Sequence, residues 1–175
     1  KWQWEVHIIQ AETMNAYVMP GGKIVFYSGI IDNLKLTDAE IAAIMGHEMA
    51  HALREHSREK LSRSMATGGV ISIASAAFGL SAGQAQVAQL AGDVGLSLPH
   101  SRTQESEADK IGLELMARAG YNPNAAVSLW QKMQAKSGSS GPQFLSTHPS
   151  SSNRIKQIQD LLPAVMPLYN ASNKK

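Results

Sequence analysis

The stretch IMGHEMAHALREHSREK, residues 44–60, decides how this chain can fold and what it can bind. In a helix each residue turns by about 100°, so His47 and His51 project from one face and both imidazoles can reach a single ion. Glu48 lies on the neighbouring flank, where it cannot join them as a ligand but can reach a water molecule on that ion. The spacing therefore predicts a zinc hydrolase helix, with Glu48 as the base that takes a proton from the water.

The other charged residues of this stretch are expected to stay outside the metal site. A regular helix continued to His56 places it about 180° from His47, so it cannot share the ion, and replacing it should leave the metal in place. Glu55 and Glu59 are expected to be solvated charges that pair with arginines on the same helix. The candidate partners are Arg54, Arg58 and Arg63.

The segment ESEAD, residues 105–109, is the candidate source of the third protein ligand that a catalytic zinc needs. Glu105 and Asp109 share one face of a second predicted helix, whereas Glu107 is turned by about 200° from Glu105. Glu105 is therefore the candidate ligand, and Asp109 the candidate acceptor of an N–H from a ligand histidine. The alternative explanation of these acidic residues is structural: they would form an acidic first turn, which the helix dipole favours.

Turn and cap signals organise the chain around these two helices. Residues 16–31 hold two strand-like runs on either side of a Pro-Gly-Gly turn, which predicts a hairpin. TDAE, residues 37–40, is a capping box that opens a helix running to about Arg63, and SRTQ, residues 101–104, opens the second helix. Gly120 is expected to end that second helix.

Three further segments complete the expected organisation. Residues 66–98 are rich in Ala, Gly and Ser, too polar for a convincing bilayer span, and are interpreted as packed helices. Asn122 and Pro123 are expected to open another helix. A Ser/Gly-rich linker at residues 136–143 leads to a final helix. Its apolar positions are Ile155, Ile158 and Leu162.

Length and composition favour one ordinary globular domain. The chain has 175 residues, of which 43% are hydrophobic and 17% charged, with a net charge of +2 and no cysteine. The balanced charge argues against a nucleic-acid partner, and the lack of cysteine excludes disulfides and thiolate ligands. Many helices with one hairpin predict an α+β, mainly helical fold, with a single domain over residues 1–169 and a loose tail over residues 170–175.

Four motifs, in this order, carry a family resemblance that spans residues 4–163. They are GHEMAH at 46–51, SRTQESEAD at 101–109, AGYNPNAAVSLWQKM at 119–133 and FLSTHPSSSNRI at 144–155. With these motifs the chain resembles the zinc metallopeptidases that include the CAAX prenyl endopeptidases, the HtpX-type heat-shock proteases and the periplasmic BepA-type proteases. The resemblance implies a gluzincin-type fold with a small sheet or hairpin bordering the active-site cleft.

The resemblance also assigns a zinc site to this chain. It implies one Zn²⁺ per chain, bound by His47, His51 and Glu105. Glu48 is then the general base, and Asp109 supports the ligands. In this reading the chain is a zinc metalloendopeptidase domain.

Two further residues match the family near the metal. His148, in the STHP motif, could plug the open site or stabilise the oxyanion, or could be a surface-loop histidine. Arg154 could orient that loop or help the oxyanion. His100 receives no role, and His7 and His56 are most simply structural or solvated.

The function expected from this resemblance is cleavage of unfolded or misfolded polypeptides in envelope protein quality control. The lack of membrane spans favours the exported branch, in the bacterial periplasm or cell envelope, with possible membrane association through a lipid anchor upstream. An extended substrate could add to the edge of the 16–27 hairpin. Two alternatives stay open. One is a latent or chaperone-like zinc module capped by the His148 loop, and the other is a structural helical domain without zinc.

Overall fold

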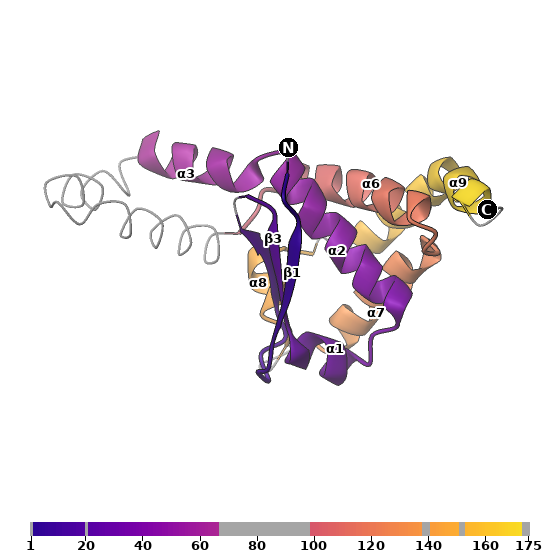
Figure 1. The fold of residues 1–175 in the computed structure, drawn as a ribbon, viewed down its shortest axis with the longest axis horizontal. Helices are drawn as coiled ribbons and strands as arrows, with labels where there is room; N and C mark the ends of the chain where they lie inside the picture. The colour runs from indigo at the N-terminus through magenta and orange to yellow at the C-terminus, as the bar shows by residue number, and fades with distance from the viewer. Residues whose placement is uncertain (1, 20, 67–98, 138–140, 151–152, 173–175) are drawn as a thin grey trace, which may run out of the picture.

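The computed structural model is an α+β fold, mainly helical, as expected (Figure 1). It describes residues 2–19, 21–66, 99–137, 141–150 and 153–172. The elements in chain order are β1 (Glu5–Ile9), β2 (Ala16–Met19), β3 (Lys23–Tyr27), α1 (Ser28–Leu34), α2 (Asp38–Leu53), α3 (His56–Ala66), α6 (Arg102–Arg118), α7 (Asn124–Ala135), α8 (Phe144–Thr147) and α9 (Arg154–Ser172). The packed helices expected at residues 66–98 lie outside the described residues, except for Ala66.

The three described strands form one small sheet in the order β1-β3-β2. Strands β2 and β3 pair antiparallel around Gly21 and Gly22, whose φ angles of 94° and 96° suit only glycine well, so the hairpin is confirmed. Strand β1 pairs parallel with β3. The second strand-like run was expected to reach residue 31, but the chain turns into α1 at Ser28. This turn buries Ile30 and Leu34, one helical turn apart, in the core.

Helix α2 packs against β2 and β3, α6 and α7 pack on α2, and α9 packs on α6 and α7. In Figure 1, α2, α6, α7 and α9 gather beside the sheet, while α3 extends away from them. Helix α2 crosses α6 at Gly46 and Gly112, where a Cβ on Gly46 would lie 2.6 Å from the Gly112 carbonyl oxygen. The two backbones therefore touch at this crossing, which only glycine permits.

The helix expected over residues 37–63 is two helices. The capping box is present, with Thr37 and Glu40 exchanging hydrogen bonds at the start of α2. Helix α2 ends at Leu53, however, because Glu55 takes the left-handed conformation with φ at 52° and α3 begins anew at His56. A left-handed residue interrupts the helical hydrogen-bond ladder and redirects the chain.

The second half of the chain largely follows the expected caps. Helix α6 has its capping box between Ser101 and Gln104, and Gly120 follows it with φ at 86°. The helix expected from Asn122 begins at Asn124, whose backbone N–H donates to the Asn122 side chain at 3.0 Å.

The last helix continues further than expected. Residues 170–172 belong to α9 and not to a loose tail, since the Ser172 hydroxyl donates to the Ala117 carbonyl at 3.0 Å. The expected boundary at residue 169 therefore falls inside this helix. Among the described helices, none is long and apolar enough to cross a membrane.

Candidate metal centre

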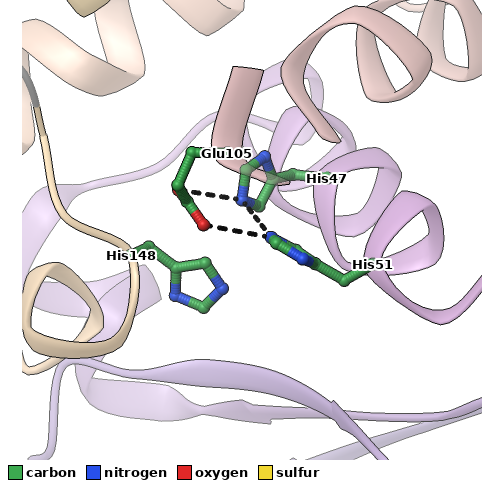
Figure 2. Close-up of side chains that lie close together, drawn as sticks. All are labelled: His47, His51, Glu105 and His148. Atoms are coloured by element: carbon green, nitrogen blue, oxygen red, sulfur yellow. Dashed lines mark hydrogen bonds and ion pairs between the residues drawn. The ribbon is translucent and has the colours of Figure 1, made fainter. Parts of the chain in front are cut away.

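His47 and His51 lie one turn apart on α2 and point to the same place, as the spacing predicts (Figure 2). Their Nε2 atoms are 3.0 Å apart, and both side chains are buried. Two imidazole nitrogens that face each other at this distance can share a proton or bind the same cation.

The crossing of α2 and α6 brings a carboxylate to these nitrogens. A Cβ on Gly112 would come within 2.8 Å of the His47 backbone nitrogen, so α6 runs against α2 directly beside this histidine. Glu105, two turns earlier on α6, then reaches both rings. Its Oε2 lies 3.5 Å from His47 Nε2 and its Oε1 lies 3.3 Å from His51 Nε2.

These residues fit a zinc ion. Ligand atoms of His47, His51, Glu105 and His148 lie within 4.8 Å of one another, and all four residues are buried. Among the described residues, Glu105 Oε1 and His148 Nε2 are buried and make no hydrogen bond, although each has an ionisable side chain within 3.3 Å. A cation would satisfy both atoms. Nitrogen and carboxylate oxygen donors are zinc ligands, so His47, His51 and Glu105 would hold the ion, with His148 close by.

Asp109 and Arg154 support the His47 side of the cluster. Asp109 Oδ1 lies 3.0 Å from His47 Nδ1, which leaves Nε2 free to face the ligand cluster. The Arg154 guanidinium, stacked 3.7 Å from the Trp130 ring centroid, donates to Asp109 at 2.7 Å and to Glu105. Arg154 thus lies behind the ligands and orders two carboxylates. It also donates to the Pro149 carbonyl at 3.3 Å, which connects it to the His148 loop.

The charges around Asp109 keep it ionised. Burial alone would raise its pKa, but the hydrogen bond from His47 and the charge of Arg154 outweigh burial and hold the pKa below its usual range. An ionised Asp109 accepts the Nδ1–H of His47 and so fixes the tautomer of the ring.

Glu48 lies on the flank of α2 next to His47 and His51, as predicted, and faces His148. Its Oε1 is 3.2 Å from His148 Nε2, yet neither atom makes a hydrogen bond among the described residues. Burial raises the pKa of Glu48 to about 8, and the negative charge of Glu105 adds to the increase while His47 opposes it. A carboxyl group with such a pKa can both accept and release a proton near neutral pH.

The geometry of His148 determines which nitrogen faces the cluster. Its ring stacks on Phe144 with centroids 4.1 Å apart, and Nδ1 lies 3.2 Å from the Phe144 carbonyl oxygen. The Thr147 hydroxyl lies 3.0 Å from the same nitrogen. With its proton on Nδ1, donated to the Phe144 carbonyl, the neutral ring would present its Nε2 lone pair to the metal ligands. The interpretation as a surface-loop histidine is wrong, because His148 is 2% exposed.

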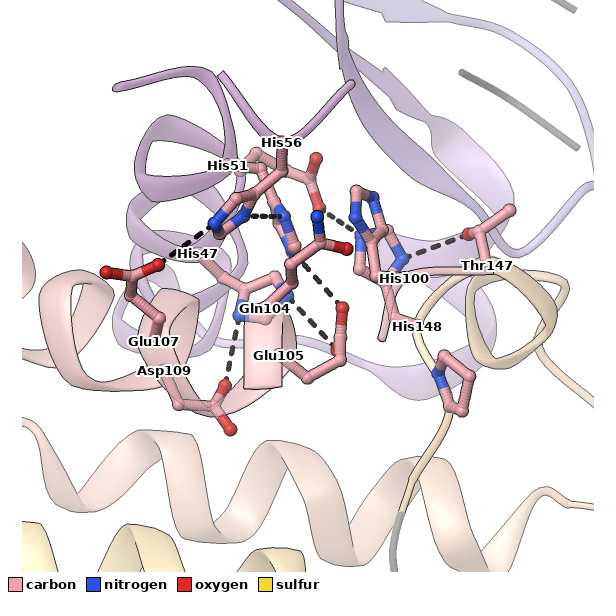
Figure 3. Close-up of polar contacts among 12 residues, drawn as sticks. His47, His51, His56, His100, Gln104, Glu105, Glu107, Asp109, Thr147 and His148 are labelled. Atoms are coloured by element: carbon pink, nitrogen blue, oxygen red, sulfur yellow. Dashed lines mark hydrogen bonds and ion pairs between the residues drawn. The ribbon is translucent and has the colours of Figure 1, made fainter. Parts of the chain in front are cut away.

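The structure adds His56 and His100 to the cluster (Figure 3). His56 is buried with its Nδ1 2.9 Å from His51 Nδ1, so the expectation that it points away from the ligands is wrong. That expectation assumed a regular helix, which the turn at Glu55 breaks. The ring of His100 lies 3.8 Å from that of His51, and its Nε2 is 3.1 Å from Lys60 Nζ.

The remaining charged residues behave more nearly as expected. Glu55 pairs with Arg58 at 3.0 Å on the surface, and His7 is exposed next to Glu5. Glu59 accepts a hydrogen bond from Gln104 of α6 at 2.6 Å, a contact that the local sequence did not indicate.

Comparisons with known proteins agree with this geometry. The sequence model of peptidase family M48 matches residues 1–162. The mitochondrial metalloendopeptidase OMA1 of Schizosaccharomyces pombe is 43% identical over 163 residues, which is 92% of this chain and 47% of the relative. OMA1 of Saccharomyces cerevisiae is 33% identical over 98% of this chain and 50% of the relative. The metalloprotease LoiP of Escherichia coli is 30% identical over 90% of this chain and 62% of the relative. The chain thus spans about half the length of the two mitochondrial relatives.

Proposed function

This chain belongs to peptidase family M48, and we propose that it is the zinc-dependent catalytic domain of an endopeptidase that cleaves unfolded or misfolded polypeptides. One observation carries the proposal. The ligand atoms of His47, His51 and Glu105 converge with that of His148, which lies 3.2 Å from the buried carboxyl group of Glu48. A metal site beside a buried carboxyl group is the arrangement that metal-assisted hydrolysis requires.

In this mechanism the chain itself holds and moves a proton. Zinc held by these ligands acidifies water and polarises a carbonyl group. Glu48 accepts the proton of the attacking water at its carboxylate and delivers it to the leaving amine nitrogen. Asp109 and Arg154 keep His47 and Glu105 in place, because their contacts with these two residues are buried and charge-assisted.

Strand β2 is the proposed place for an extended substrate. It is an edge strand, since the sheet order is β1-β3-β2, so its outer backbone groups can pair with another strand. The Val18 backbone lies close enough to Glu48 to oppose the rise of its pKa, which places this edge beside the base. A pocket of about 160 Å³ lies between β2 and the start of α3, lined by Val18, Met19, His51 and Ala52 among others. An apolar substrate side chain would fit there.

The proposed cellular role is protein quality control in the bacterial cell envelope. Its support is the resemblance to periplasmic BepA-type proteases and the 30% identity with the Escherichia coli metalloprotease LoiP. Two relatives of higher identity are mitochondrial, so the location needs its own test. Fractionation of cells of the source organism, with detection of the native protein, supports the proposal if the protein is found with the envelope. Recovery from another compartment contradicts it.

The activity is tested by removal and return of the metal. Purified protein should contain one zinc ion per chain and cleave a reduced, unfolded protein. Cleavage should stop when zinc is chelated and return when zinc alone is added. Protein that binds zinc but cuts no unfolded substrate would contradict the proposed activity.

A second candidate function, a latent zinc module, rests on the position of His148. Its Nε2 lies beside both Glu48 and the ligand cluster, where it can occupy the position that a water molecule needs. If zinc-loaded protein is inactive and His148→Ala cleaves readily, latency is the better description. His7→Ala, a change of an exposed histidine on β1, is the matched control and should leave activity unchanged.

A further inference from the structure

His51 has different partners at its two ring nitrogens. Nε2 faces the metal cluster, 3.0 Å from His47 Nε2 and 3.3 Å from Glu105 Oε1. Nδ1 faces away from the cluster and lies 2.9 Å from His56 Nδ1. The other nitrogen of His56 lies 3.1 Å from Glu107 Oε2 on α6. Figure 3 shows these three side chains in a row that ends at the metal ligands.

The protons along this row can be placed from the chemistry of each group. A His51 that binds metal through Nε2 carries its proton on Nδ1, so Nδ1–H donates to His56 Nδ1. His56 then accepts at Nδ1 and carries its own proton on Nε2. That Nε2–H donates to the Glu107 carboxylate, which can only accept. All three groups are satisfied with no proton left over.

We infer that His56 and Glu107 are positioning residues for the zinc ligand His51, a role that rests on the zinc site of the proposed function. Glu107 fixes the tautomer of His56, and His56 in turn fixes the tautomer and ring orientation of His51. The Arg54 guanidinium, 2.7 Å from Glu107 Oε1, holds the carboxylate at the outer end of the row.

The backbone supports this assignment. The left-handed conformation of Glu55, with φ at 52°, is uncommon for a non-glycine residue and costs energy. It ends α2 and turns the chain so that His56, five residues after His51, comes back to the ligand ring. A buried contact on the metal ligand gives a physical reason to keep this turn.

A second metal ion among His51, His56 and His100 is the competing explanation, since their ligand atoms also lie within 4.8 Å of one another. The charges disfavour it. An ion there would share the His51 imidazole with the first zinc, and His100 Nε2 lies 3.1 Å from the Lys60 ammonium group. Two dications and a lysine in one buried cluster would repel each other strongly.

The inference is tested by zinc affinity, measured by competition with a chelator. His56→Ala and Glu107→Ala should each weaken zinc binding by about 10- to 100-fold, the range for partners behind metal ligands. His56→Asn should recover part of this loss, because its side-chain oxygen can accept near the position of Nδ1. Glu114→Ala, an exposed carboxylate on the same helix paired with Arg118, and His7→Ala are the matched controls. Unchanged affinity in both alanine variants overturns the inference.

Further measurements separate positioning from other roles. Because Glu107 acts through His56, the double variant should lose no more zinc affinity than His56→Ala alone. A loss of apo-protein stability with unchanged zinc affinity would show a structural role and overturn the inference. Two zinc ions per wild-type chain, falling to one in His56→Ala, would overturn it in favour of a second metal site.

Two safeguards keep the test decisive. Glu107 is half-buried, so its variant remains testable if His56→Ala does not fold. Zinc affinity is also measured independently of peptide cleavage. If the variants weaken zinc binding as expected but the wild-type protein does not cleave, the proposed function is contradicted and the inference about His56 and Glu107 is not.

Discussion

Two glutamates on α2, Glu40 and Glu48, both have almost no exposed surface, yet their pKa values shift in opposite directions, and Glu48 lies deeper in the molecule. They are 2% and 1% exposed. Glu40, near the start of the helix, accepts hydrogen bonds from the Thr37 backbone at 2.8 Å, the Ser128 hydroxyl at 2.7 Å and the Lys132 ammonium group at 2.6 Å. Glu48, two turns later, has an Oε1 with no hydrogen-bond partner among the described residues.

The pKa values of the two glutamates follow from these partners. Burial would raise the pKa of both. At Glu40 the hydrogen bonds from Lys132, Thr37 and Ser128 together outweigh burial, and the pKa is lowered. At Glu48 burial dominates and the pKa rises to about 8. Burial alone therefore does not decide what a carboxyl group does; a satisfied one stabilises the fold, and an unsatisfied one is available for chemistry.

Replacing each glutamate with glutamine should have its largest effect on kcat, and only at Glu48. Glu48→Gln should keep zinc but lower kcat for cleavage of an unfolded protein by about 10²- to 10⁴-fold, because the base is gone. Glu40→Gln should leave kcat per folded molecule unchanged. Steady-state kinetics with metal analysis measures both. Retained cleavage in zinc-loaded Glu48→Gln would rule out Glu48 as the base.

In the free energy of unfolding, the order of the two variants should be reversed, with the larger loss in Glu40→Gln. Glu40→Gln removes one partner of a buried ion pair, and we expect a loss of about 2 to 3 kcal/mol, toward the low end for such pairs because Lys132 is partly exposed. Glu48→Gln should cost less than about 0.5 kcal/mol, because Glu48 has no comparable ion pair to lose. Urea unfolding of the apo proteins measures both. Equal losses would show that the two sites do not differ as described.

The metal site shows which parts of the molecule the sequence could predict. His47, His51 and Glu48 follow from helical spacing alone, and Glu105 from a second acidic segment that shares a face. The structure brings His47, His51 and Glu105 together, with Glu48 on the same helix and 3.2 Å from His148. This placement could be predicted because it depends on regular geometry within one helix and on the type of ligand that zinc requires, and the roles of these residues stay predictions.

His56 shows where such reasoning stops. Its position depends on a left-handed turn at Glu55, and neither glycine, asparagine nor proline stands there to indicate one. The Glu40–Lys132 pair could not be predicted from the sequence either, since it joins α2 to α7 across 92 residues and depends on how the two helices pack. His148 and Arg154 were found only through family resemblance, because their loop has no periodic pattern that would place it at the metal.

The pH dependence of stability should distinguish Glu40 from a merely buried carboxyl group. Its folded pKa lies below its unfolded value of about 4.3, so its contribution is present above that pH and is lost as pH falls through the folded pKa. The difference in unfolding free energy between wild type and Glu40→Gln should therefore be largest near neutral pH and shrink below about pH 4. Unfolding curves at a series of pH values measure this difference. A gap that widened in acid would mean that the pKa of Glu40 is raised.

The smallest expected effect comes from the single hydroxyl that completes the Glu40 site. Ser128→Ala removes the 2.7 Å hydrogen bond to Glu40 Oε1 but leaves the Lys132 ion pair and the Thr37 backbone donor in place. We expect a loss of about 1.5 kcal/mol in unfolding free energy, the low end of the range for a hydrogen bond to a charged group. Ser137→Ala, an exposed serine beyond the end of α7, is the control and should change stability by less than about 0.5 kcal/mol.

In the Glu40→Gln background Ser128→Ala should cost less stability than in wild type, because the charge that strengthened the hydrogen bond is gone. Equal costs in the two backgrounds would mean that the hydroxyl acts on its own helix, through the Ala125 carbonyl to which it also donates, and not on Glu40.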